Sequence, residues 1–98
     1  MKRSKVKGKK FDGNKPMVDL LDPEWLLEVS QVLTHGAKKY GLYNWQNRLE
    51  QRRILAAALR HIIAYWKGEK IDKDSGLPHL AHLSCCIMFA SWYDRRIK

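Results

Sequence analysis

Three of the four histidines in this 98-residue chain fall on either side of one short polar stretch. His61 lies near the end of one apolar stretch, and His79 and His82 lie at the start of the next. Two histidines three residues apart lie on one side of a helix, where neutral imidazoles can bind one divalent cation. We therefore expect a divalent-metal site here, with Mg²⁺ or Mn²⁺ as first candidates and other transition metals possible.

Carboxylates in the stretch between the histidines can complete such a site. Asp72 is the expected fourth metal ligand beside His61, His79 and His82. Glu69 is the candidate general base, and together with Asp72 it forms an E-x-x-D pattern that recurs in magnesium pyrophosphohydrolases. The predicted catalytic residues are thus Glu69, Asp72 and His61. The alternative is that the histidines are hydrogen-bonded polar residues of a helix core beside an ordinary acidic loop.

A second group of residues, at 36–45, combines lysines, aromatic side chains and glycines. Lysine can pair with phosphate, and an aromatic face can stack on a base. Arg60 lies inside a largely apolar stretch, where its charge requires a partner such as a phosphate. The predicted substrate-binding residues are Lys15, Lys38, Lys39, Tyr40, Asn44, Trp45 and Arg60. The alternative is a helix end with cations on the dipole and aromatic residues that anchor a loop.

Three helices must position these residues, at about 22–40, 49–67 and 75–95. Asp22-Pro23 gives the first a capping residue and a proline suited to the first turn. The second and third helices both carry apolar residues on two faces. This is more apolar surface than a single short chain can bury. The expected fold is all-α, a small bundle of three main helices completed by homo-oligomerisation.

Charge and composition divide the chain into two parts. Residues 1–15 hold seven of the 19 basic residues and one acidic residue, so we expect a flexible basic arm at 1–10 and a helical nucleotide-binding domain at 11–98. With 45% hydrophobic and 30% charged residues, the whole chain is neither disordered nor a disulfide scaffold. The adjacent Cys85 and Cys86 indicate reduced thiols, and no stretch is long and apolar enough for a membrane span. A soluble cytoplasmic protein is expected, with no membrane partner.

Several motifs, in order, resemble the phage dATP/dGTP diphosphohydrolase family, which is grouped with the MazG-like all-α NTP pyrophosphohydrolases. The motifs are KFDGNKP at 10–16, THGAKKY at 34–40, NW at 44–45, ALRH at 58–61, GEKID at 68–72 and SGLPHLAH at 75–82. The resemblance implies a helical oligomer of phage or prophage origin and a divalent metal. It also implies cleavage of a purine deoxynucleoside triphosphate to monophosphate and pyrophosphate.

The chain departs from the wider MazG group at one point, because that group carries an E-x-x-E on one helix. Here Glu24 and Glu28 are four residues apart and no E-x-x-E occurs, so the metal ligands would be partly histidines.

The favoured function is a metal-dependent nucleotide pyrophosphohydrolase acting on purine nucleoside triphosphates. An alternative is a non-catalytic phage sponge that sequesters a nucleotide-derived host immune signal, which needs cations and aromatic residues but no activated water. A third is a small nucleic-acid-binding protein, suggested by the basic arm, although the arm lacks interleaved aromatic residues.

Overall fold

The structure is a computed structural model that describes residues 8, 9, 11 and 13–96, so most of the predicted basic arm lies outside the described residues. Three long helices make up the fold: α1 (Pro23–Tyr40), α2 (Gln51–Trp66) and α3 (His79–Arg96). Two short 3₁₀ helices, η1 (Val18–Leu20) and η2 (Asn44–Gln46), precede α1 and α2. Within the described ranges the only extended pairing is an isolated bridge between Ile71 and Pro78. The predicted all-α fold with three main helices is confirmed.

The ends of α1 follow from the local sequence. Asp22 accepts a hydrogen bond from the backbone N–H of Glu24 at 3.1 Å, and Pro23 occupies the first turn. At the other end Gly41 has a φ of 101°, which favours glycine, and its N–H donates to Ala37. Both boundaries are as predicted.

The predicted start of the third helix, at residue 75, is wrong. Gly76 has a left-handed φ of 73°, and Pro78 pairs with Ile71, so residues 75–78 belong to the preceding loop. The helix begins at His79 instead. The second helix likewise begins at Gln51 rather than 49, because Arg48 has a φ of 56° and the Leu49 N–H bonds to a side chain of α3.

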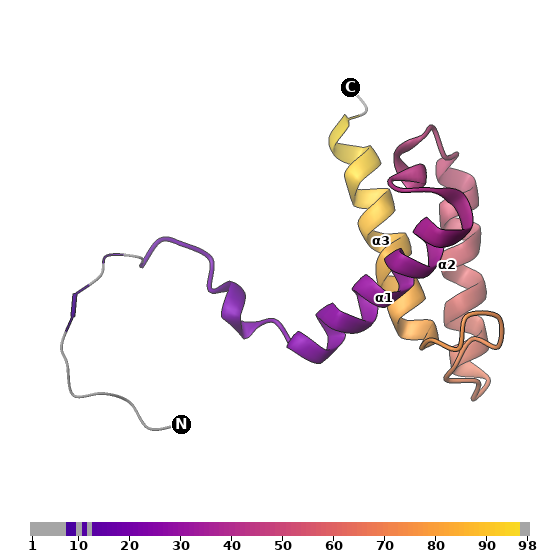
Figure 1. Ribbon diagram of the computed structural model, residues 1–98, viewed down its shortest axis with the longest axis horizontal. Coiled ribbons are helices and arrows are strands. Elements are labelled where there is room, and N and C mark those ends of the chain that lie inside the picture. The colour runs from indigo at the N-terminus through magenta and orange to yellow at the C-terminus, as the bar shows by residue number, and fades with distance from the viewer. Residues whose placement is uncertain (1–7, 10, 12, 97–98) are drawn as a thin grey trace.

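Helix α3 is the central element, because it packs against both α2 and α1 (Figure 1). Small residues, Ala81 and Cys85, lie at its contact with Val32 of α1 and are almost fully buried. The Cys85 thiol lies 3.6 Å from the carbonyl of Val29, to which it donates. Burial raises the pKa of Cys85 to about 12, and both cysteines are free thiols, in agreement with the sequence.

Helix α2 buries one of its two apolar faces and leaves the other uncovered. Ile54 is buried against the rest of the chain. Leu55, Leu59, Ile63 and Trp66 follow one another along α2 and are exposed, Trp66 to 85%. We call these four residues the outer α2 stripe. Figure 1 also shows η1 and the first turns of α1 extending away from the other helices, with Leu26 and Leu27 exposed.

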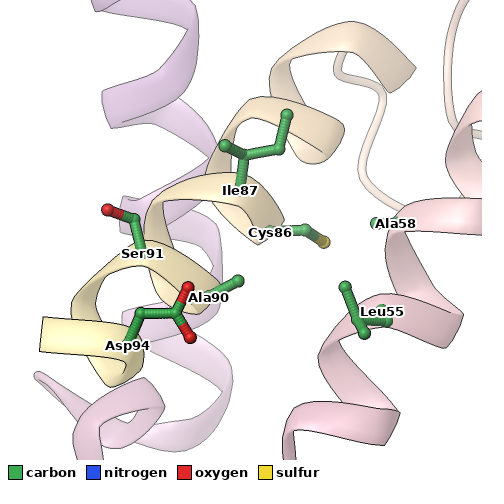
Figure 2. Close-up of a pocket in the computed structure, with 7 residues that line it drawn as sticks. All are labelled: Leu55, Ala58, Cys86, Ile87, Ala90, Ser91 and Asp94. Carbon is green, nitrogen blue, oxygen red and sulfur yellow. The ribbon is translucent and has the colours of Figure 1, made fainter. Parts of the chain in front are cut away.

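A groove of about 260 Å³ separates α2 from α3 beside this stripe (Figure 2). Leu55 and Ala58 of α2 face Cys86 and Ala90 of α3 across it, and Asp94 lies towards one end. Leu55 lines the groove and also belongs to the outer α2 stripe, so the groove is continuous with the uncovered face of α2.

Tyr93 of α3 fastens the connection between α1 and α2. Its hydroxyl donates to the carbonyl of Trp45 at 2.6 Å and accepts from the N–H of Leu49 at 2.9 Å. The Trp45 ring stacks on Phe89 with centroids 4.7 Å apart, and its contact with Trp92 is edge-on at 5.3 Å. One phenol thereby satisfies two backbone groups of the connection.

Replacing Tyr93 with Phe should lower the free energy of unfolding by about 1–3 kcal/mol, because a backbone donor and a backbone acceptor lose their partner. Chemical denaturation measures this difference. The matched control is Tyr40→Phe, at an exposed position, which should change stability little. Equal effects of the two substitutions would contradict the role assigned to Tyr93.

Candidate metal centre

The loop between α2 and α3 folds back over the ends of both helices and brings its carboxylates to the histidines. The N–H of Glu69 donates to Ala64 of α2, and the N–H of His79 donates to the carbonyl of Lys70 at 2.9 Å. Within the loop the N–H of Asp72 donates to Leu77 at 2.9 Å. His61 from α2 and His79 and His82 from the first turn of α3 therefore face the loop residues.

His61, Asp72 and His82 form a compact cluster in which one possible ligating atom from each lies within 4.8 Å of the others. The His61 and His82 rings stack with centroids 4.6 Å apart, and His82 Nε2 lies 3.3 Å from Asp72 Oδ2. Two ligand atoms at about 2.1 Å from a cation in tetrahedral or octahedral geometry lie about 3.0–3.4 Å apart. The donor set suits a divalent cation, and the 3.3 Å between His82 Nε2 and Asp72 Oδ2 matches this spacing.

Ser75 holds the cluster together, and sequence reasoning missed it. Its hydroxyl lies 2.7 Å from His82 Nε2 and 3.4 Å from Asp72 Oδ2, and it accepts from the N–H of Leu77. The other Asp72 oxygen accepts from the N–H of Asp74 at 3.1 Å. A serine three residues after an aspartate, before Gly-Leu-Pro, is typical of such a turn and was the available signal.

His79 lies beside this cluster with both ring nitrogens occupied. Its Nδ1 is 2.9 Å from Nδ1 of His61, and its Nε2 is 2.7 Å from Oε2 of Glu69. The side chain is buried, whereas Glu69 is partly exposed and also lies 3.8 Å from the ammonium of Lys73. The predicted roles of His79 as a ligand and of Glu69 as a base stay predictions. Each role would require the hydrogen bond between the two side chains, or that between His79 and His61, to break.

The protonation states suit a cation. Burial lowers the pKa of His61, and a positive charge on His82 or His79 would lower it further. Burial also lowers the pKa of His82, although the Asp72 carboxylate opposes this. For Asp72, burial would raise the pKa, but the N–H of Asp74 and the nearby histidines lower it overall. At neutral pH the cluster thus holds neutral imidazoles and an ionised carboxylate, the forms that bind metal.

His35 of α1 is a further residue of this region that the prediction of site residues omitted. It is close enough to His82 that a positive charge on it would lower the pKa of His82. Lys38 and Lys39 follow one turn later on α1 and are exposed, and the Lys39 ammonium lies over its own neighbour Tyr40 at 5.3 Å. His35 therefore places α1 within electrostatic reach of the cluster, and Lys38 and Lys39 lie further along the same helix.

The remaining predicted site residues are not all brought together. Arg60, next to His61 on α2, is exposed and its charge lowers the pKa of His61. Trp45 packs on Phe89, about 10 Å along α3 from His82, and anchors the connection with the half-buried Asn44. Lys15 is exposed in the segment that Figure 1 shows leading away from the three helices.

The fold and cluster together define a small helical protein with a histidine and carboxylate site at a helix junction. A family model described as "dATP/dGTP diphosphohydrolase, N-terminal" matches residues 5–98, so the chain belongs to this family. The family predicted from the motifs is confirmed.

A curated relative, the dATP/dGTP diphosphohydrolase of Salmonella phage PMBT28, is 41% identical over 85 residues. The match covers 87% of this chain and 29% of the relative, so the chain spans less than a third of that protein. No solved structure matches the chain. In the part of the chain that the structure describes, the helices are not long and apolar enough to cross a membrane.

Acid should destabilise the fold as the pH drops below about 6.5, the ordinary pKa of histidine. Because His61 and His82 have lowered pKa values when folded, the unfolded chain binds more protons in this range. The free energy of unfolding therefore decreases as the pH is lowered. The measurement is the melting temperature from about pH 8 to about pH 5 in metal-free buffer. His61→Gln, which does not titrate, should give a shallower dependence; an unchanged slope would contradict the assignment.

Proposed function

We propose that this chain binds a nucleoside triphosphate together with a divalent cation and takes part in its hydrolysis to monophosphate and pyrophosphate. The observation that carries the proposal is the convergence of His61, Asp72 and His82 from α2, the loop and α3 on one space. The family to which the chain belongs supports a nucleotide substrate, since the relative is named for dATP and dGTP. A purine deoxynucleoside triphosphate is therefore the proposed substrate class.

The main demand of phosphoryl transfer is to offset negative charge on the phosphate oxygens and hold the reacting groups in line. A divalent cation held by His61, Asp72 and His82 would supply charge neutralisation and polarise a phosphate oxygen. Arg60 adjoins the cluster on α2, and Lys38 and Lys39 extend from α1. These side chains would bind the outer phosphates, while burial of the histidines keeps them neutral as ligands.

The test of this function compares metal content and nucleotide products in wild type and His82→Ala. We expect wild type to bind Mn²⁺ or Mg²⁺ and to convert dATP or dGTP to monophosphate and pyrophosphate, resolved by chromatography. His82→Ala should lose metal-dependent turnover, with a smaller loss of nucleotide binding, because the cations elsewhere remain.

Leu80→Ala, on the same turn of α3 and exposed, is the matched control and should keep metal and turnover. Nucleotide binding without turnover for any metal would contradict hydrolysis and favour a sponge. Lower thermal stability of His82→Ala with unchanged metal content would contradict the ligand role.

We also propose that a second copy of the chain covers the outer α2 stripe. A single copy leaves this stripe, the groove of Figure 2 and the exposed leucines of α1 uncovered, and large exposed apolar patches commonly mark an interface. The exposed face of α1 in one copy could pack into the groove beside α2 of the other copy.

Sedimentation at micromolar concentration should give a species larger than the 11.5 kDa chain. Leu59→Glu should shift it towards the monomer, because a charge in the stripe cannot be buried without a partner. Lys67→Glu, at the exposed end of α2, is the charge-changing control and should leave the assembly intact. A monodisperse monomer in wild type would refute the oligomer.

A further inference from the structure

His79 is the one buried polar side chain of the described core, exposed to only 5%. Both of its ring nitrogens have a side-chain partner: Glu69 Oε2 at 2.7 Å on Nε2, and His61 Nδ1 at 2.9 Å on Nδ1. Neither nitrogen is left for a cation unless one of these hydrogen bonds breaks. The arrangement therefore points to a role that acts through His61.

The hydrogen bonds determine where each proton lies. An ionised carboxylate only accepts, so Nε2 of His79 must carry the proton that is donated to Glu69. If His79 is neutral it has one N–H, so its Nδ1 is an acceptor and the proton between the two histidines belongs to Nδ1 of His61. Nε2 of His61 is then unprotonated and keeps its lone pair.

We propose that Glu69 and His79 are positioning residues that fix His61 as its Nδ1–H tautomer, so that Nε2 is available as a ligand beside Asp72 and His82. The ligand part rests on the metal site proposed above, whereas the tautomer does not. The second N–H of a metal-binding imidazole is commonly held by a carboxylate, a carbonyl or a water, and here the His79 ring, backed by Glu69, takes that place. The proposal gives Glu69 and His79 roles other than base and ligand.

The geometry also explains why His79 is a histidine. Its ring must accept from one side and donate to the other across a buried gap between α2 and the loop. Leucine fills a comparable volume with neither function, whereas a glutamine amide supplies one acceptor and two donors. His79→Gln and His79→Leu are thus a matched pair that separates hydrogen bonding from packing.

The experiment reads the histidine tautomers by ¹⁵N NMR in metal-free protein near neutral pH. In wild type, His61 should be protonated at Nδ1 and His79 at Nε2. His79→Gln should preserve the His61 tautomer, and His79→Leu should shift it towards Nε2–H. Glu69→Ala, a change at a partly exposed loop position, tests the same link if His79→Leu does not fold, and it should weaken the preference at His61. A wild-type His61 protonated at Nε2 would overturn the proposal.

A Zn²⁺ titration of the same samples tests the ligand part. Metal-bound nitrogen shifts should appear on His61 and His82, and His79 should keep its Nε2 proton. His79→Leu should weaken affinity by roughly 10–100-fold, and His79→Gln should restore most of it. A metal-bound shift on His79 would overturn the positioning role in favour of direct ligation. No binding by wild type would refute the metal site, while the tautomers of the metal-free protein still decide the positioning role.

Discussion

The fold depends on the need of one buried imidazole for two partners. His79 begins α3, and its hydrogen bonds reach across to His61 in α2 and back to Glu69 in the loop. An unsatisfied buried polar group costs on the order of 1–3 kcal/mol, so any packing of α2, α3 and the loop that keeps His79 buried must also supply both partners. The same two contacts that close the helix junction also set the position of His61 next to Asp72. The packing of the helix junction and the geometry of the site therefore depend on the same two hydrogen bonds.

A charge balance follows from that geometry. Burial lowers the pKa of His61 and of His82, which favours their neutral forms, while the N–H of Asp74 and the neighbouring histidines lower the pKa of Asp72. A cation there would be held by one negative and two neutral ligands, a softer set than the paired carboxylates of the wider MazG group. Arg60, next to His61 on α2, adds a charge suited to phosphate. The proposed nucleotide chemistry thus distributes positive charge between the protein and the ion.

Much of the fold was predictable because its signals are local. The Asp22-Pro23 start, the stop at Gly41 and the apolar spacing of each helix depend on neighbours within a few residues, and the three helices are where these signals indicate. The position of α3 was predicted four residues early, because the left-handed Gly76 and the pairing of Pro78 with Ile71 depend on loop geometry.

The sequence predicted which residues gather at the site, but not what each side chain contacts there. Spacing brought His61, Asp72 and His82 into one hypothesis, and the structure places them together. Spacing could not show that the His79 ring contacts His61 and Glu69, because i and i+3 share a helix face whether a ring faces an ion or another histidine. His35 and Ser75 were missed, since they reach the cluster from α1 and from a turn. Trp45 shows the opposite case, in which an aromatic residue beside lysines serves to anchor a loop.

The small side chains at the α1 and α3 contact have a consequence for reach. Ala81 and Cys85 let α1 approach closely enough for the Cys85 thiol to bond the carbonyl of Val29. His35 of the same α1 is close enough to His82 to act on its pKa, so the thickness of this layer sets the distance between α1 and the histidines. A bulkier core side chain here would push α1 outward and move His35 away from His82, without changing any residue of the cluster.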